Sequence, residues 1–262
     1  MAWFKPLNPP LTEWAGRSVW LVGASSGIGE ALARRLSAQG ARVAVSARNA
    51  QALEAMSQAL PGVKAWPLDV SDEASVSRVA QAIEQDQGLD VVVYCAGHYL
   101  PQSATAFDLA QMQRHWEINV NGAMRVLASV LPPLLAQRRG HIALLASVAG
   151  YRGLPKALAY GQTKAALRNL ADSLYIDLHP LGIGVSVVNP GFVETPLTSQ
   201  NDFHMPALIS TDEAAQEVCA GWARGVFEIH FPKRFTRVMK LLSVLPDRWY
   251  FAVMKWVAKN GG

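Results

Sequence analysis

Leu21-Val-Gly23-Ala-Ser25-Ser26-Gly27-Ile28-Gly29-Glu30 is the stretch that decides the fold of this chain of 262 residues. It ends the apolar run 18–22 and opens an amphipathic segment, 27–39, whose apolar side chains recur at helical spacing. Glycines here allow a tight turn and bring backbone N–H groups and the positive end of a helix to one point, where phosphates bind. The stretch therefore predicts a strand, a phosphate-binding turn and a helix. A turn that binds no ligand is disfavoured because the three parts follow in the required order.

The rest of the chain alternates short apolar runs with longer amphipathic segments, as parallel βαβ units do. We expect strands at residues 18–22, 43–46, 63–68, 91–94, 141–145, 184–188 and 225–230. We expect helices at residues 27–39, 50–60, 71–87, 106–136 and 157–178, the third of them capped by Ser71. The strands are mostly apolar on both faces, which is typical of a parallel sheet between two helical layers. The predicted fold class is α/β: a single Rossmann-type, doubly wound sheet of about seven strands.

Composition suggests three parts. Residues 1–16 form an N-terminal arm, residues 17–231 form the Rossmann-type domain with a substrate lid at 196–210, and residues 232–262 form a basic, amphipathic helical extension. Half of the residues are hydrophobic, so one large core can be buried.

The cellular setting is predicted from the two cysteines and from the apolar runs. Cys95 and Cys219 are too few for a disulfide framework, which favours a reducing, cytoplasmic setting. No apolar run reaches the roughly 18 residues that cross a bilayer, and the N-terminus lacks a signal-peptide pattern. We expect a cytoplasmic protein, either soluble or peripheral on the inner face of a membrane.

A second motif is Tyr160-Gly-Gln-Thr-Lys164, with Ser147 thirteen residues upstream. In a helix, the spacing stacks Tyr160 and Lys164 one turn apart on one face. An ammonium about 4 Å away, at an effective dielectric of about 20, is worth roughly 4 kcal/mol, so we expect Lys164 to lower the pKa of the phenol toward neutrality. The pair alone is weak evidence, because a core tyrosine beside a solvated lysine has the same spacing.

These motifs and Asn189-Pro190-Gly191 occur together in the order and spacing of one family. Over about residues 17–231 the chain resembles the short-chain dehydrogenase/reductase family. The resemblance implies a catalytic tetrad of Asn119, Ser147, Tyr160 and Lys164.

The resemblance also implies a role for each member of the tetrad. Tyr160 would exchange a proton with the substrate oxygen, and Ser147 would hydrogen-bond the carbonyl. Lys164 would bind the nicotinamide ribose and lower the pKa of the phenol. Asn119 would distort its helix and hold a water; Asn121 lies nearby, but the spacing to Gly122 favours Asn119.

The end of the second strand predicts the cofactor. An NAD site has a carboxylate there for the ribose hydroxyls, whereas this chain has Ala47 and then Arg48. A guanidinium donates to a 2′-phosphate in a planar fork, so Arg48, helped by Ser25 and Asn49, favours NADP(H) over NAD(H). An arginine that is only solvated is the alternative. With the resemblance, the predicted cofactor site comprises Gly23, Ser25, Ser26, Gly27, Ile28, Gly29, Arg48, Asn49, Asp69, Val70, Ala96, Gly97, Tyr160, Lys164, Pro190, Gly191, Val193 and Thr195.

Two positions carry more than one interpretation. Asp69 resembles the family's adenine contact, and it could also cap the helix that follows. After the fourth strand the family usually has Asn-Asn-Ala-Gly, whereas this chain has Tyr94-Cys95-Ala96-Gly97, so the hydrogen bonds of those asparagines must be replaced.

A mainly apolar substrate pocket is expected beside the tetrad. We assign to it Ser147, His98, Tyr99, Leu100, Tyr151, Phe192 and the lid residues Leu197, Phe203, Met205 and Leu208, and we expect His98 and His204 to take no part in catalysis. No group of residues has metal-ligand spacing, and Ser147 lacks the Gly-x-Ser-x-Gly elbow of a hydrolase, so neither a metal site nor acyl transfer is expected.

The predicted function is NADP(H)-dependent interconversion of a carbonyl and a secondary alcohol, on a small hydrophobic substrate. A non-catalytic NADP(H)-binding sensor or scaffold is the main alternative, although it would have little reason to keep the whole tetrad. A dehydratase or epimerase would need a larger C-terminal domain. From the family we expect a homodimer or homotetramer, paired through the helices at 106–136 and 157–178.

Charge is concentrated at the C-terminus. The chain has a net charge of +4, but residues 232–262 hold seven Lys or Arg against Asp247, which gives +6 and leaves −2 for the remainder. This distribution argues against a nucleic-acid surface spread over the fold. Apolar stripes recur before and after Pro246 beside basic residues, as in helices that lie on membranes, although packing on the protein is the alternative. The stripes comprise Phe235, Val238, Met239 and Leu242, and then Trp249, Val253, Trp256 and Val257.

Overall fold

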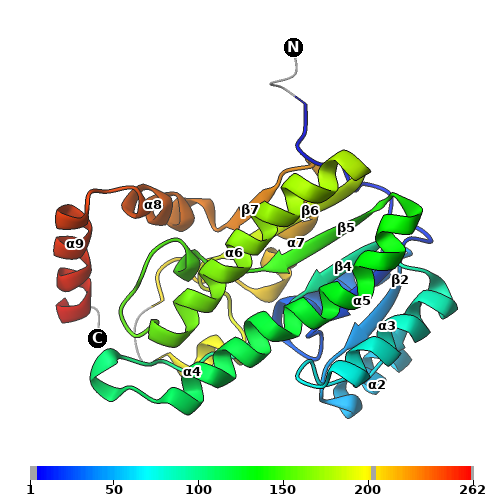
Figure 1. The fold of residues 1–262 in the computed structure, drawn as a ribbon, viewed down its shortest axis with the longest axis horizontal. Coiled ribbons are helices and arrows are strands. Elements are labelled where there is room, and N and C mark those ends of the chain that lie inside the picture. The colour runs from blue at the N-terminus through cyan, green and yellow to red at the C-terminus, as the bar shows by residue number, and fades with distance from the viewer. Residues whose placement is uncertain (1–4, 202–204, 261–262) are drawn as a thin grey trace.

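Apolar strands and amphipathic helices alternate along the chain, and in the computed structural model, which describes residues 5–201 and 205–260, they build a three-layered α/β fold (Figure 1). Within these residues, seven parallel strands form one sheet in the order β3-β2-β1-β4-β5-β6-β7. The chain starts in the middle of the sheet, winds to one edge and then returns to build the other half. The predicted fold class is therefore confirmed.

The strands occupy nearly the positions that their apolar runs predict. β3 ends earlier than predicted, where Pro67 interrupts the run, and β7 begins later, because Gly225 has a φ of +62° in the turn before it. The strands are β1 Ser18–Val22, β2 Arg42–Ser46, β3 Val63–Ala65, β4 Val91–Tyr94, β5 Gly140–Leu145, β6 Ile183–Pro190 and β7 Glu228–Phe231.

The helices differ from prediction at three places. The helix at 71–87 begins at Glu73, because Asp72, not Ser71, accepts from the Ser75 N–H. The expected helix at 106–136 is divided by a π-helical turn, and a helix at 211–223 was not predicted. The helices are α1 Gly27–Ser37, α2 Ala50–Ala59, α3 Glu73–Gln87, α4 Leu109–Trp116, α5 Gly122–Gln137, α6 Leu158–Leu178, α7 Thr211–Ala223, α8 Lys233–Ser243 and α9 Asp247–Asn260.

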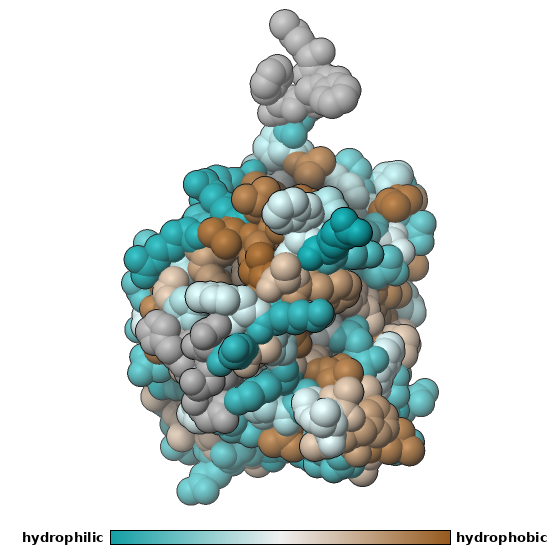
Figure 2. Space-filling view, turned by 90° about the vertical axis from the view of Figure 1, so that its left-hand side faces the viewer, coloured by the Kyte–Doolittle hydropathy of each residue, from teal (hydrophilic) through white to brown (hydrophobic). Residues whose placement is uncertain are grey.

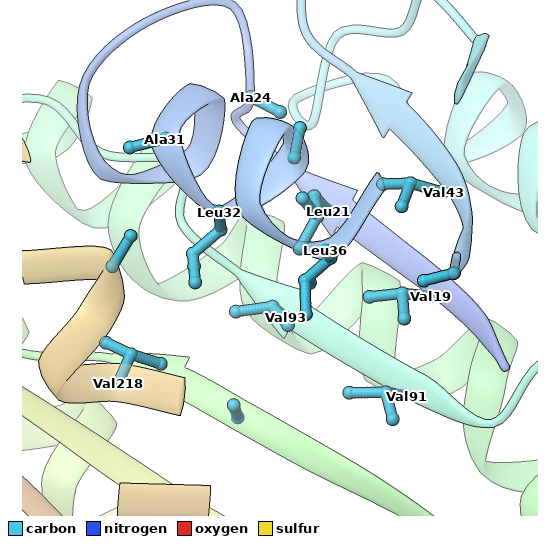
Figure 3. Close-up of a cluster of buried hydrophobic side chains, with 14 of the residues drawn as sticks. Val19, Leu21, Ala24, Ala31, Leu32, Leu36, Val43, Val91, Val93 and Val218 are labelled. Atoms are coloured by element: carbon cyan, nitrogen blue, oxygen red, sulfur yellow. The ribbon is translucent and has the colours of Figure 1, made fainter. Parts of the chain in front are cut away.

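Alternate residues of each strand face opposite layers, as the pleat requires. Val19 and Leu21 of β1 pack toward α1, α2 and α7, together with the N-terminal segment (Figure 3). Trp20 and Val22 pack toward α3, α5 and α6 on the other face. Both faces of the strand are therefore fully buried, which explains why it lacks the polar alternation of a half-exposed strand.

The segment from α4 to α5 is one long helical stretch. By length and composition alone, the helical stretch Leu109–Gln137 could cross a membrane, because an 18-residue window within it has a mean hydropathy of 1.2; no single apolar run predicted this. Val126, Val130 and Leu134 of this stretch are buried in the core. Packing against the sheet therefore accounts for its apolar composition.

The N-terminal segment is fastened to the far half of the sheet by Asn8. The Asn8 side chain donates to the Val185 carbonyl at 2.8 Å and accepts from the Val185 N–H at 3.0 Å, and its own N–H donates to the Gly225 carbonyl. Leu11 and Trp14 then enter the core beside α1 and α7. These contacts give the arm a structural role in the main core.

We expect Asn8→Ala to lower the free energy of unfolding by about 2–4 kcal/mol, because it leaves the N–H and C=O of Val185 buried without partners. Denaturant unfolding followed by circular dichroism measures the change. Leu7→Ser is the control, with an expected change within about 0.5 kcal/mol, because Leu7 is exposed. Equal stability of the two variants would contradict a structural role for the arm.

Candidate active site

A cavity of about 720 Å³ opens at the carboxyl ends of the central strands, the edge at which parallel sheets bind ligands. All of the predicted cofactor residues line it, as does Ser147. They come from the turn after β1, the ends of β2 and β3, the loop after β4, the N-terminal half of α6 and the segment after β6. One site thus gathers residues that are up to 172 positions apart, from Gly23 to Thr195.

Backbone packs against backbone at the glycine turn. Gly23 has a φ of +91°, and a Cβ atom there would lie 2.3 Å from the Ala96 nitrogen. A Cβ atom on Gly29 would lie 2.4 Å from the Gly23 carbonyl oxygen. Only glycine fits at either position, so β1, the N-terminus of α1 and the loop after β4 approach one another closely. The result is a cradle of backbone groups that suits a phosphate.

The β2 side of the cavity carries a positive charge. Arg48 is exposed at the cavity, and its charge helps to lower the pKa of Asp69. Burial raises that pKa, but the hydrogen bonds from the N–H and hydroxyl of Ser71 outweigh it. Asn49 uses Oδ1 to cap α2, accepting from the Ala52 N–H at 3.1 Å, which leaves its amide nitrogen as the donor toward an anion.

Ser147, Tyr160 and Lys164 meet on the β5 side. Ser147 follows β5 directly, and its side chain hydrogen-bonds that of Tyr160, which lies in the first turn of α6. Lys164, one turn later, has its Nζ 5.4 Å from the centre of the Tyr160 ring and donates to the Leu145 carbonyl at 2.7 Å. The predicted helical spacing thus brings the three side chains together.

The pKa values of this group depend mainly on burial. Burial raises the pKa of Tyr160, with the Ser147 hydrogen bond acting in the opposite direction, and burial lowers the pKa of Lys164 to about 8. The expectation that Lys164 lowers the phenol pKa is therefore not met in this structure. The reason is geometric, because the Lys164 ammonium is directed at the Leu145 carbonyl. Its distant charge therefore lowers the Tyr160 pKa by less than desolvation of the phenolate raises it.

Asn119 lies at the π-helical turn Glu117–Asn121 and is fully buried. Its Oδ1 accepts from the His98 N–H at 2.7 Å, and its Nδ2 donates to the Thr163 hydroxyl at 2.9 Å. A Cβ atom on Gly97 would lie within 4 Å of both Asn119 Oδ1 and Lys164 Nζ. Asn119 therefore joins the loop after β4 to α6 behind Lys164. Asn121 instead donates to Glu117, which agrees with the choice of Asn119.

Tyr94, the last residue of β4, joins the sheet to the π-helical turn. Its hydroxyl donates to the carbonyl of Ile118, in the π-helical turn. Cys95 is partly buried beside Lys164, and desolvation raises the pKa of its thiol to about 12. The loop is also held by His115, whose Nε2 accepts from the Leu100 N–H at 3.1 Å and whose Nδ1 donates to the Gln111 carbonyl. His115 has no sequence signal, because its partners are set by the fold.

Besides Tyr99, six of the predicted substrate residues do not line the cavity: His98, Leu100, Tyr151, Phe192, Met205 and Leu208. Tyr151 donates to Glu228 at 2.6 Å, His98 pairs with Gln111 at 3.2 Å, and the Phe192 ring lies 5.4 Å from that of Phe235. Two other predicted residues lie nearer: the Tyr99 ring meets Tyr160 edge-on at 5.0 Å, and Leu197 lines the cavity. Phe203 and His204 lie outside the described residues.

Sequence analysis missed several parts of the site. Thr198, whose hydroxyl donates to the Val193 carbonyl at 2.6 Å, lines the cavity together with Pro196 and Gln200. Such contacts depend on the path of the segment after β6 and leave no mark in the spacing of residues.

Glu228 is a second missed residue. It accepts from Tyr151, Asn189 and Lys240; burial raises its pKa, but these donors lower the pKa to about 2. Tyr151 belongs to the loop that begins at Ser147. Glu228 and its donors therefore lie beside that loop.

Known proteins share both the sequence pattern and the fold. The model of the short chain dehydrogenase family matches residues 17–205. An uncharacterized oxidoreductase of Myxococcus xanthus is 34% identical over 251 residues, which cover 94% of this chain and 99% of that protein.

Two solved structures have a similar fold. A short-chain dehydrogenase of Burkholderia cenocepacia in complex with NADP has a TM-score of 0.81 at 23% identity, over 92% of this chain and 98% of its own. A short-chain dehydrogenase/reductase of Burkholderia phymatum in complex with NAD has a TM-score of 0.81 at 22% identity, over 88% of this chain and 94% of its own.

Burial of Lys164 predicts a pH-dependent stability. Its pKa falls from 10.5 to about 8 on folding, so the unfolded chain binds more protons between these values and stability rises with pH there. Relative to Lys164→Met, which removes the titration, the free energy of unfolding of the wild type should rise by about 2 kcal/mol from about pH 7.5 to about pH 9.5. Denaturant unfolding of both proteins across this range measures the difference. A constant difference would mean that Lys164 titrates normally.

Proposed function

This chain belongs to the short-chain dehydrogenase/reductase family of oxidoreductases, and from that membership we propose that it interconverts a carbonyl and a secondary alcohol with NADP(H). One observation carries the proposal: the side chains of Ser147, Tyr160 and Lys164 meet in the same cavity as the glycine turn and Arg48. A phosphate cradle thus shares a site with a group that can hold and move a proton.

The residues of the cavity fit a nicotinamide dinucleotide. The backbone cradle between Gly23 and Ala96 suits the pyrophosphate. On the β2 side, Ser25 and Arg48 offer donors for phosphate, and on the β5 side Lys164 offers an ammonium for ribose hydroxyls. When bound, the nicotinamide supplies or accepts the hydride, and the remaining steps belong to the residues of the chain.

Tyr160 holds the proton that completes the reduction. As the substrate carbon gains a hydride, its oxygen takes the proton from the Tyr160 hydroxyl, and the phenolate is later protonated again from solvent. Ser147, already hydrogen-bonded to Tyr160, is positioned to donate to the same carbonyl oxygen. Lys164 keeps a positive charge one helical turn away, which offsets only part of the cost of burying the phenolate as it forms.

The preference for NADP(H) rests on Arg48. It lies at the cavity directly after β2, and the position before it, Ala47, has no carboxylate to repel a 2′-phosphate. Asn49 can add a donor through its amide nitrogen. A planar guanidinium binds phosphate in a bidentate fork, which is the interaction that distinguishes the two cofactors at this point.

The substrate and the assembly are also proposals. Leu197 lines the cavity and the Tyr99 ring packs edge-on against Tyr160, which favours a small hydrophobic ketone, aldehyde or alcohol. The outer faces of α5 and α6 expose Met124, Leu135 and Ile176, consistent with pairing into a homodimer or homotetramer. A cytoplasmic location remains a prediction.

We expect Tyr160→Phe to lower kcat at least about 10³-fold while the dissociation constant of NADPH changes less than about twofold, because only the transferable proton is lost. The assay follows the reduced-nicotinamide absorbance of NADPH with a panel of hydrophobic ketones and aldehydes, and binding is followed by nicotinamide fluorescence. Tyr175→Phe, on the same helix but away from the cavity, should keep full turnover. NADPH binding without turnover of any carbonyl by the wild type would favour a sensor.

Arg48→Asp should change the ratio of kcat/KM for NADPH over NADH by at least about 10²-fold in favour of NADH, because it removes a charge-assisted donor and adds a repelling carboxylate. Arg78→Asp, an exposed arginine on α3, is the control for the change in net charge. A ratio that moves equally in both variants would show that Arg48 does not read the 2′-phosphate.

A further inference from the structure

The outer side of the C-terminal helices exposes large apolar side chains. On α8, Val238 is 52% exposed and Leu241 is 65% exposed, and Val244, just after it, is 77% exposed. On α9, Trp249 is 68% exposed and Trp256 is 67% exposed. Exposed apolar side chains that cluster on consecutive helices indicate a surface that binds something.

The inner side of the same helices is fixed to the domain. Arg152 donates to the Leu245 carbonyl at 2.6 Å, pairs with Asp247, and lies 3.9 Å over the ring of Tyr250. Tyr250 is buried and donates to the Gly153 carbonyl at 2.5 Å. The helices therefore pack on the domain through their inner side, where Asp247 is also paired. This packing holds the outer apolar side chains in place as a preformed surface.

Basic residues share this outer surface. Arg237, Arg248, Lys255 and Lys259 are exposed beside the apolar side chains, and Asp247, the one acidic residue in 232–262, is paired with Arg152. A second copy of the chain would bring two segments of charge +6 against each other, which is unfavourable. A partner for this surface must be anionic and must also accept aliphatic and indole groups.

We propose that the outer side of α8 and α9 binds an anionic lipid bilayer. Aliphatic side chains enter the region below the headgroups, Trp249 lies at the interface, and the four cations contact lipid phosphates, each contributing about 1 kcal/mol. Figure 2 views the end of the molecule where these helices lie and shows apolar patches between strongly hydrophilic side chains. Apolar area and cations act together on one surface, as in interfacial helices.

Together with the proposed function, this surface specifies how substrate arrives. The loop that holds α9, Tyr151-Arg152-Gly153, follows Ser147, and Phe235 of α8 packs against Phe192 beside the cavity residue Gly191. A bilayer on the outer side would lie next to the substrate side of the cavity. The substrate class is then a carbonyl or alcohol that partitions into lipid.

Flotation with vesicles tests the binding of lipid. Full-length protein is mixed, at physiological salt, with vesicles of phosphatidylcholine alone or with equal parts of phosphatidylcholine and phosphatidylglycerol. We expect flotation with the anionic vesicles, weakened by added salt. Lys255→Glu should lower the partition coefficient at least about fivefold, which corresponds to the loss of about 1 kcal/mol for the lysine alone. Leu241→Ser should lower it severalfold through lost apolar burial.

Matched controls separate this surface from general effects of charge or hydrophobicity. Arg78→Glu, on α3, and Leu7→Ser, at the N-terminal segment, make the same kinds of change on other exposed parts of the molecule and should leave flotation unchanged. Failure of the wild type to float, or equal losses in all four variants, would overturn the proposal. A lower mass of Leu241→Ser in light scattering without vesicles would also overturn it, by showing that the surface pairs two copies. Flotation does not measure turnover, so its failure leaves the proposed oxidoreductase activity intact.

Discussion

The contact of backbone with backbone at Gly23 is the constraint on which the rest of the site depends. There is space for a hydrogen atom, but not for a methyl group, between this residue and Ala96, and Gly29 closes on Gly23 in the same way. β1 is therefore locked between the helix that follows it and the loop after β4. Because β1 pairs with both β2 and β4, this contact also aligns the strand ends that carry Arg48 on one side and Gly97 on the other. The cavity lies at the carboxyl ends of these strands.

Whether a feature could be predicted from sequence depends on how far apart along the chain its interacting residues lie. β1 and β4 begin and end where their apolar runs do, and the spacing of Tyr160 and Lys164 predicts that they share one helix face, because both are local properties. The direction of the pKa shifts could not be predicted, since burial by distant segments decides it. α7 was missed even though Ser210 and Glu213 form a capping box, a local signal that could have identified it.

The departure from the family pattern at Tyr94 illustrates a compensation that sequence alone does not disclose. Where the family pattern has an asparagine, the Tyr94 side chain reaches across to the carbonyl of Ile118 in the π-helical turn. The same turn presents Asn119 to His98 and Thr163. One distortion of the helix thus provides an acceptor for the substituted residue and a position for the tetrad asparagine. The two effects are coupled through residues 24 positions apart, beyond the range of any spacing argument.

Glu228 shows why the C-terminal extension is not simply appended to the Rossmann core. A partly buried carboxylate with a pKa of about 2 needs several donors, and each one comes from a different element. Tyr151 comes from the loop after Ser147, Asn189 from β6, and Lys240 from α8. Without Lys240 the carboxylate would lose the donor to one of its two oxygens, and its burial would become more costly. Glu228 therefore connects α8, through Lys240, to the loop after Ser147, through Tyr151.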